Sequence, residues 1–247
     1  MTGPGLCPVL MAIQASDGLI LKGTLRYPDG AGGRRFPLAV LAHQYPATHA
    51  AFEPLVQDLL ALGFATLAFD QRGHGESIQS PAGPVVIQAP ADFSDAAFGT
   101  AFMASAASVR FPLIPDDIVR AAAWGVAQNF TSGQVLLVGG SVGGPGVLLA
   151  APAVRPLLGV ITLGAAGALA LGPDAPDRIR HNLEAAAWPV LLASSEGDPF
   201  GGAASVRAWS EGLSRVHAVV SPGNGHAMAI YYDVRDDVRD FARRCIA

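Results

Sequence analysis

Short apolar runs alternate with amphipathic stretches along most of the chain. An uninterrupted apolar run of about four to eight residues is typical of a strand buried on both faces, and apolar residues at helical spacing indicate a helix packed on one side. These patterns predict strands over residues 9–15, 19–27, 38–42, 64–69, 135–138, 158–163, 190–193 and 216–220. They predict helices over residues 50–62, 116–128, 146–151, 177–187, 203–213 and 231–244.

This alternation of strand and helix defines the expected fold class, α/β. Parallel neighbours need crossover connections, which the helices supply, so we expect a mostly parallel sheet with helices on both faces. Asp17-Gly18 separates the first two strands and is a hairpin signal, which predicts an antiparallel edge. We therefore expect one domain over residues 1–247, built on an eight-stranded sheet.

Composition and charge narrow the function. Hydrophobic residues make up 51% of the chain and charged residues 15%, which fits extensive buried faces and argues against disorder. The formal net charge is −4 and the basic residues are scattered, so the chain offers no electrostatic case for binding nucleic acid. A small, uncharged molecule fits this balance better as a partner, and a homodimer stays open.

The cysteines and the N-terminal segment bear on redox state and location. Cys7 and Cys245 lie near opposite ends, and we expect two unpaired thiols, with a disulfide between the termini as the alternative. No metal-ligand spacing is present, so no metal is expected. The chain has neither a signal-peptide pattern nor a transmembrane stretch. We expect a cytoplasmic protein, although a secreted chain that has lost its leader would look the same.

The strongest chemical motif is Gly139-Gly140-Ser141-Val142-Gly143, which follows a predicted strand and precedes a helical stretch. This is the G-x-S-x-G pattern of a sharp strand-to-helix turn, in which small residues let strand and helix approach closely. Such a turn holds the serine hydroxyl at the end of the sheet. Because the chain contains 29 glycines, the pattern needs support from other residues.

A serine hydroxyl becomes a good nucleophile only beside a base that is itself oriented by an acid. His226 follows the last predicted strand, so its loop should emerge at the same sheet edge as Ser141. Asp198 follows another strand and is our candidate acid, with Glu196 as the alternative. We expect His217 to be packed within its strand and His181 to face solvent from its helix.

An oxyanion formed at such a serine needs fixed N–H donors. The backbone of Val142, directly after Ser141, should supply one donor. The second should come from the loop that follows the strand ending near residue 42, with Tyr45 as the better candidate and Gln44 as the alternative. Pro46 has no N–H group and is excluded.

Two further segments stand out. Residues 70–77 contain a histidine and a serine, but their glycines, aspartate and arginine favour a tight structural loop. Residues 78–115 interrupt the alternation with an apolar, nearly uncharged insert, which is either an extra packing element or a lid over a pocket. As candidate substrate-binding residues we take His43, Phe98, Phe102 and Met103.

Together these segments resemble the α/β-hydrolase fold superfamily, and within it the serine esterases and lipases. The resemblance covers nearly the whole chain in the family's order. It implies that Ser141 is the nucleophile, His226 the general base and then acid, and Asp198 the orienting carboxylate. It also implies acyl-serine chemistry on esters without a cofactor. Gln44 departs from the glycine that many members have there.

The resemblance also bears on the cap that many members insert after the sixth strand. Only about twenty-five residues separate Leu163 from Pro189, so we expect no large cap there. The resemblance favours a carboxylesterase, while a thioesterase, lactonase, carbon–carbon bond hydrolase or perhydrolase would use the same residues. A catalytically inactive binding module is the alternative from another class. A dinucleotide-binding oxidoreductase is disfavoured, because no G-x-G-x-x-G follows the first strand.

Overall fold

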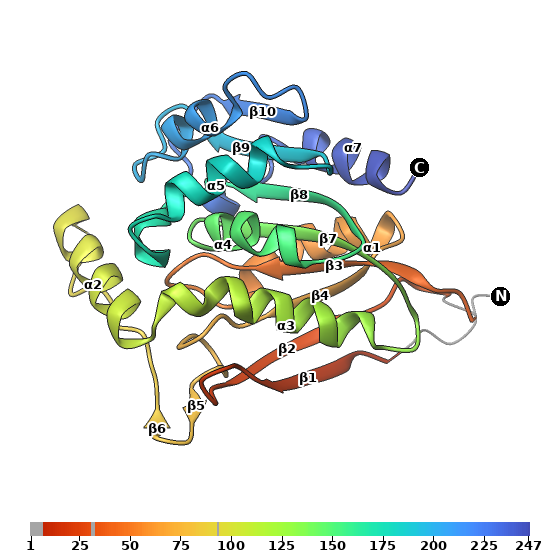
Figure 1. Ribbon diagram of the computed structural model, residues 1–247, viewed down its shortest axis with the longest axis horizontal. Coiled ribbons are helices and arrows are strands. Elements are labelled where there is room, and N and C mark those ends of the chain that lie inside the picture. The colour runs from red at the N-terminus through yellow and green to blue at the C-terminus, as the bar shows by residue number, and fades with distance from the viewer. Residues whose placement is uncertain (1–6, 31–32, 93) are drawn as a thin grey trace.

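The computed structural model describes residues 7–30, 33–92 and 94–247. Within these residues ten strands form one sheet in the order β10-β9-β8-β7-β3-β4-β2-β5-β6, and β1 pairs with β2 (Figure 1). The strands are β1 (Val9–Gln14), β2 (Ile20–Arg26), β3 (Phe36–Ala42), β4 (Ala65–Phe69), β5 (Gln79–Ser80), β6 (Gly83–Pro84), β7 (Thr131–Gly140), β8 (Leu157–Leu163), β9 (Val190–Ser195) and β10 (Val216–Ser221). The eight expected strands are present, and the two-residue strands β5 and β6 are additional.

The sheet is parallel from β10 to β4 and antiparallel beyond it. β2 runs antiparallel to β4, and β1 runs antiparallel to β2, as the hairpin signal predicts. Every residue of β4 and of β9 is buried, which explains their uninterrupted apolar sequences. β2 instead alternates buried and half-buried positions, because one of its faces is less covered. The expected fold class is confirmed.

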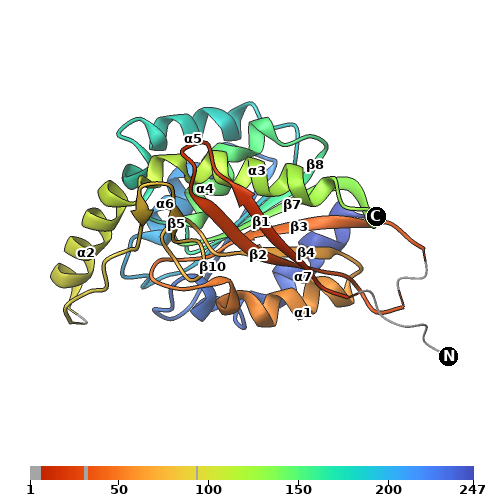
Figure 2. The ribbon, with the colours of Figure 1, turned by 90° about the horizontal axis from the view of Figure 1, so that it is seen from below.

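Helices cover both faces of the sheet (Figure 2). α1 (Glu53–Ala61) and α7 (Arg235–Cys245) pack on one face, where Phe52, Phe64 and Tyr231 are fully buried. The other face carries four helices: α3 (Ile114–Val126), α4 (Gly143–Ala150), α5 (Ala175–Glu184) and α6 (Gly202–Ser210). The sheet therefore separates two apolar cores, and its carboxyl edge is left for loops.

A buried carboxylate ties α1 to α7. Asp58 in α1 accepts a hydrogen bond from the Tyr231 hydroxyl at 2.5 Å and pairs with Arg235 at 2.6 Å and Arg239 at 2.5 Å. The hydrogen bond from Arg235 is the largest influence on Asp58, and with those from its other partners it outweighs burial and lowers the pKa of the carboxyl to about 2. The carboxylate therefore stays charged at neutral pH and joins helices far apart in the sequence.

Residues 70–77 form a tight structural loop. The Asp70 carboxylate accepts hydrogen bonds from the backbone N–H groups of His49 at 2.8 Å and Glu76 at 2.9 Å. The buried Arg72 guanidinium pairs with Asp117 at 2.6 Å and Asp17 at 3.1 Å. These contacts join the loop to α3 and to the β1–β2 hairpin, in agreement with the structural interpretation of this segment.

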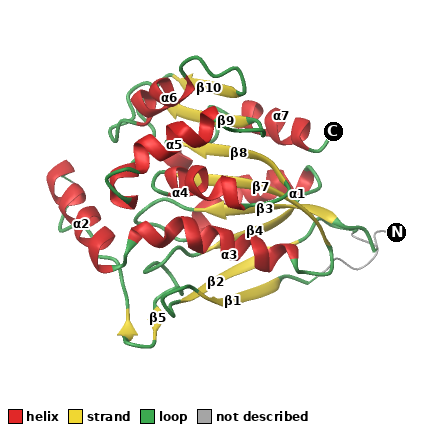
Figure 3. Ribbon diagram, viewed as in Figure 1, coloured by secondary structure: helices red, strands yellow, loops and turns green. Residues whose placement is uncertain are grey.

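The insert over residues 78–115 contains the small β5–β6 hairpin and the helix α2 (Asp95–Ser108). Figure 3 shows α2 projecting from the carboxyl edge of the sheet, away from the other helices. The Ser105 hydroxyl anchors it by accepting a hydrogen bond from the Gln88 N–H at 2.8 Å. After β8, residues 164–189 hold only a short 3-10 helix (Ala168–Leu171) and α5, so no large cap is present there, as expected.

Two other expectations have definite outcomes. His217 is exposed on the edge strand β10, so the expectation that it is packed is wrong, whereas His181 is exposed on α5 as expected. Among the described residues no single helix is long and apolar enough to cross a membrane. α2 and Phe111–Val126 pass that test only as a pair bent by 65°.

Candidate active site

Ser141 lies in a strained turn between β7 and α4. Its φ of 50° is in the left-handed region, which residues with a side chain rarely adopt. The flanking glycines make the turn feasible: a Cβ on Gly139 would lie 2.2 Å from the Gly143 carbonyl oxygen, and one on Gly143 would lie 2.1 Å from that of Ala42. The backbone is therefore close-packed around Ser141, as in a nucleophile elbow.

His226 and Asp198 form a hydrogen-bonded pair at the ends of β10 and β9. His226 Nδ1 lies 2.9 Å from each carboxylate oxygen of Asp198. Burial opposes ionisation of this carboxyl, but hydrogen bonds from His226, the Phe200 N–H and the Ser194 hydroxyl outweigh it and hold its pKa below the ordinary value. The charged carboxylate orients Nδ1–H of the imidazole and leaves Nε2 free to accept a proton.

Hydrogen bonds between the loop that follows β9 and the loop that follows β10 hold Asp198 and His226 in place. The Ser195 hydroxyl donates to the Gly225 carbonyl at 2.6 Å, and the Gly197 N–H donates to the Gly223 carbonyl at 2.8 Å. Glu196, the alternative acid, instead pairs with Arg207 on the surface. Geometry therefore favours Asp198 over Glu196 as the partner of His226.

Ser141 and His226 both lie beside the end of β8. The Ser141 N–H donates to the Leu163 carbonyl at 3.0 Å. At the next residue, Gly164, a Cβ would lie 3.1 Å from both His226 Nδ1 and Asp198 Oδ2. The three candidate residues thus lie around one point, the end of β8, at the carboxyl edge of the sheet.

A cavity of about 270 Å³, which we call the Ser141 cavity, opens over this point. Ser141 lines it with 9% of its surface exposed, between β7, α2 and the loop that follows β9. The cavity is largely aromatic, with Tyr45, Phe98, Phe102 and Phe200 in its wall. The Phe200 ring lies 4.8 Å from that of Phe98 and 4.5 Å from that of His226. One aromatic row therefore joins α2 to the imidazole.

The cavity wall includes two of the four expected substrate-binding residues. Phe98 and Phe102 line it, but Met103 is 54% exposed and lies outside it, because it projects from a different side of α2. Phe200 and Asp95 line the cavity and were not among the candidates. Phe200 follows Asp198 by two residues, which is a usable sequence signal, whereas nothing in the sequence singles out Asp95.

His43 also departs from the expectation that it binds substrate, because its ring is fully buried away from the cavity. Nδ1 donates to the Gln44 carbonyl at 2.8 Å, and Nε2 accepts from the Gln71 N–H at 3.0 Å. Burial, helped by the nearby His74 ring, lowers the pKa of His43 to about 3. The neutral ring therefore supports the loop after β3 and lies outside the cavity wall.

The candidate oxyanion donors are backbone N–H groups beside Ser141. Val142 is the N-cap of α4, where N–H groups have no partner within the helix. Within the described residues the N–H groups of Val142, Gln44 and Tyr45 have no hydrogen-bond acceptor. The Tyr45 side chain is buried, and its hydroxyl donates to the Gln88 carbonyl at 2.5 Å. Both candidates for the second donor therefore remain open.

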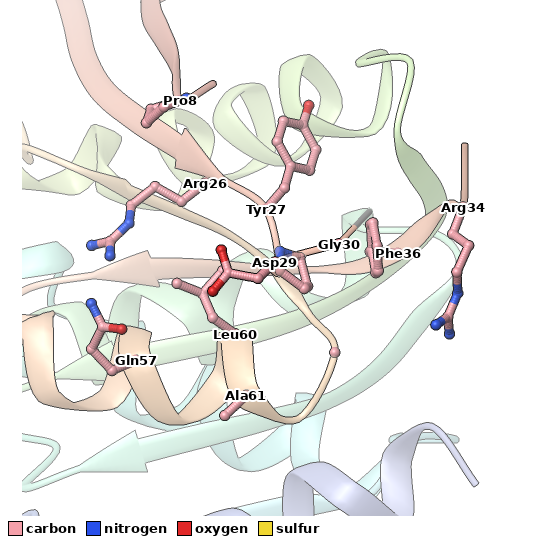
Figure 4. Close-up of a pocket in the computed structure, with 12 residues that line it drawn as sticks. Pro8, Arg26, Tyr27, Asp29, Gly30, Arg34, Phe36, Gln57, Leu60 and Ala61 are labelled. Atoms are coloured by element: carbon pink, nitrogen blue, oxygen red, sulfur yellow. The ribbon is translucent and has the colours of Figure 1, made fainter. Parts of the chain in front are cut away.

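A larger hollow, of about 650 Å³, lies elsewhere (Figure 4). Its lining comes from the end of β2, from α1 and from the start of β3, including Arg26, Asp29, Phe36 and Gln57. It therefore lies at the amino ends of the parallel strands, opposite Ser141, and contains none of the candidate site residues. Volume alone does not identify the reactive site.

Neither metal-binding clusters nor a disulfide mark the described residues. No group of three His, Cys, Asp or Glu side chains among residues 7–30, 33–92 and 94–247 is arranged to hold a metal ion. Cys7 and Cys245 are both free thiols, as expected.

A three-layer α/β sandwich with a serine elbow and a His–Asp pair at its carboxyl edge defines the class of α/β hydrolases. The family model described as alpha/beta hydrolase fold matches residues 37–178, more than half of the sequence, so the chain belongs to this family. The resemblance to the α/β-hydrolase fold superfamily that the sequence shows is thereby confirmed. A search of curated proteins finds no match.

Solved structures agree on the fold. Est1E from Butyrivibrio proteoclasticus, solved with ferulic acid, shares 18% identity over 96% of this chain and 99% of its own, with a TM-score of 0.72. The dienelactone hydrolase from Anabaena variabilis shares 21% identity over 96% of both chains, with a TM-score of 0.62. An esterase from Pyrococcus furiosus shares 14% identity over 97% of this chain and 91% of its own, with a TM-score of 0.65.

Proposed function

We propose that this chain is a serine hydrolase that cleaves carboxylic esters of small or medium acyl compounds through an acyl-serine intermediate. The observation that carries the proposal is the His226–Asp198 pair at 2.9 Å beside the strained Ser141 turn, with Ser141 open to an aromatic cavity. A nucleophile, a base and an orienting acid are the minimum set for acyl transfer by a serine.

In this mechanism His226 Nε2 removes the proton of Ser141 Oγ as the oxygen attacks the ester carbonyl. Asp198 holds Nδ1–H and stabilises the imidazolium that forms. The N–H group of Val142, with that of Tyr45 or Gln44, stabilises the oxyanion. The imidazolium then protonates the leaving alcohol. Water, deprotonated by His226, cleaves the acyl-serine and restores the free hydroxyl.

The test is hydrolysis of nitrophenyl butyrate by wild type and Ser141→Ala. We expect a loss of at least about a thousandfold in kcat, because the residues of such a triad act as a unit. Ser132→Ala, at an exposed position near the start of the same strand, is the matched control and should keep wild-type activity. A fluorophosphonate probe should add its mass to Ser141. Undiminished hydrolysis by Ser141→Ala would refute the proposed nucleophile.

A matched pair of variants tests the choice of Asp198 over Glu196 as the acid. Asp198→Asn should lower kcat by about ten-thousandfold, because an asparagine no longer selects the productive imidazole tautomer. Glu196→Gln lies two residues away and removes the same charge, yet it should leave kcat unchanged since Glu196 faces Arg207. Equal losses in the two variants would contradict the assignment of Asp198.

The acyl group is the remaining part of the proposal. The aromatic wall of the Ser141 cavity and the ferulic acid held by the structural neighbour Est1E support including a phenylpropanoid ester in the substrate panel. The volume of about 270 Å³ is slightly below the usual range of drug-sized ligand pockets, about 300–1,000 Å³. This supports a preference for small acyl groups.

A further inference from the structure

One charged side chain lines the Ser141 cavity. Among the described residues in its wall, Asp95 alone carries a formal charge, and neither lysine nor arginine is present. Asp95 has no ion-pair partner in the described part of the chain. Its negative charge at the cavity is therefore unneutralised by any neighbouring side chain.

A structural role alone would account for an acidic residue at this position. Asp95 is the first residue of α2, and Ser94 caps the helix by accepting from the Ala97 N–H at 3.3 Å. Carboxylates are favourable in the first turn of a helix because they complement its dipole. That role, however, does not require the side chain to line a reactive cavity, and Asp95 does both.

Asp95 is itself exposed to solvent, but the rest of the cavity wall strengthens its effect on a bound charge. Tyr45, Phe98, Phe102 and Phe200 surround the space that an ester would fill. Walls of low dielectric constant focus the field of a charge into a cavity, and aromatic faces attract cations. An ester with a carboxylate or sulfonate would find no cation here to pair with, while an ammonium group would find a carboxylate and aromatic rings.

We propose that Asp95 makes the active site charge-selective, so that at equal size it favours cationic esters over uncharged ones and disfavours anionic ones. This inference rests on the proposed serine hydrolase function and names the substrate class of the same site. Asp95 acts as a specificity-determining residue and takes no part in bond making or breaking.

The size of the effect follows from the cavity. The cube root of its volume places Asp95 and a bound ester within about 7 Å of each other, less than the Debye length of about 8 Å at physiological ionic strength. With an effective dielectric constant between about 80 and 20, Coulomb's law at this separation gives roughly a threefold to fiftyfold change per unit charge.

The test compares three butyrate esters of similar shape. Their alcohols are choline, neohexyl alcohol, in which carbon replaces the ammonium nitrogen, and isethionate, which is anionic. Release of butyric acid in a pH-stat gives kcat/KM for each. For wild type we expect kcat/KM for the choline ester above that for the neohexyl ester, and that for the neohexyl ester above that for the isethionate ester, with about threefold to fiftyfold per step at low salt. The steps should shrink as salt is added.

Variants test whether the charge of Asp95 itself causes the selectivity among the three esters. Asp95→Asn should bring the three values together, and Asp95→Glu should restore the wild-type order. Asp240→Asn removes one charge from α7, where Asp240 pairs with Arg243, and should keep the wild-type ratios. An order that persists in Asp95→Asn, or an equal loss of order in Asp240→Asn, overturns the inference.

Failure of the inference and failure of the proposed function differ in outcome. A wild type that hydrolyses all three esters at similar rates overturns the charge selectivity and leaves the hydrolase intact. A wild type that hydrolyses none of them and is not labelled at Ser141 by a fluorophosphonate overturns both.

Discussion

Acid should destabilise this protein through two buried histidines, His43 and His74. Their rings are shielded from solvent and lie edge to face, with centroids 4.9 Å apart. Burial lowers the pKa of His43 to about 3, with a further contribution from His74, and burial lowers the pKa of His74 to about 4. In the unfolded chain both side chains return to an ordinary pKa of about 6.5.

The direction in which stability changes with pH follows from proton binding. Between about pH 6.5 and pH 4 the unfolded chain binds a proton at each histidine and the folded chain does not, so the free energy of unfolding falls as pH falls. Each histidine costs about 1.4 kcal/mol per pH unit, or about 2 kcal/mol by pH 5. Burial raises the pKa of Asp117 to about 6, which opposes this loss in part. Against a typical stability of about 5–15 kcal/mol, the loss is large.

Urea unfolding of wild type and His74→Asn between pH 7.5 and pH 5 isolates one histidine. An asparagine amide can replace His74 Nδ1, which donates to the Arg72 carbonyl at 3.0 Å, but it does not titrate. Whatever the offset at pH 7.5, the variant should gain about 2 kcal/mol relative to wild type by pH 5. Asp117 is present in both proteins and its contribution cancels. His217→Asn, at an exposed position, is the control and should show a constant difference. A constant difference for His74→Asn as well would refute the reasoning.

Two other predictions concern the cavity wall and the contact between α1 and α7. Phe102→Ala should enlarge the Ser141 cavity and raise kcat/KM for longer acyl chains relative to butyrate by roughly fourfold per added methylene, since each buried methylene contributes about 0.8 kcal/mol. Met103→Ala, one residue away but outside the cavity, should leave the chain-length profile of nitrophenyl esters unchanged, and an identical shift in both variants would contradict the placement. Asp58→Asn should lower the free energy of unfolding in urea at pH 7 by about 2 kcal/mol, because the pKa of about 2 means that this stability is present above about pH 4 and is lost as pH falls toward 2. Asp240→Asn, which breaks only an exposed pair, should change it by less than about 1 kcal/mol, and equal effects would show that Asp58 contributes no more than a surface charge.

The sequence predicts the sheet well because buried strands have uninterrupted apolar runs. It is weaker where burial is partial. The apolar run predicts a strand over residues 135–138, but β7 spans Thr131–Gly140, because Thr131 already pairs with Phe36 of β3 and an irregular stretch with exposed polar residues separates it from Val135. His217 was expected to be packed, yet β10 is the edge of the sheet, and an edge position depends on strand order rather than on local sequence.

The insert over residues 78–115 shows a second reason why the sequence predicts only part of the structure. α2 carries apolar residues on several sides, including the exposed Met103, so no single face repeats at helical spacing. Its sequence therefore indicated an unusual segment without fixing its bounds or its orientation. The same limit explains the outcomes for Phe102, which faces the cavity, and Met103, which does not.

These cases together indicate which part of the chemistry is encoded locally. Ser141, Asp198 and His226 each follow a strand, and parallel strands bring their carboxyl ends to one edge, so their convergence can be inferred from strand order alone. Asp95 and Phe98 line the cavity beside Ser141 only because the insert places α2 at that edge, which no local pattern determines. The proposed reaction therefore depends on the geometry of a sheet edge, whereas the proposed substrate preference depends on the insert. Variants in α2 should consequently change which ester is favoured, while variants at the strand ends should remove hydrolysis of every ester alike.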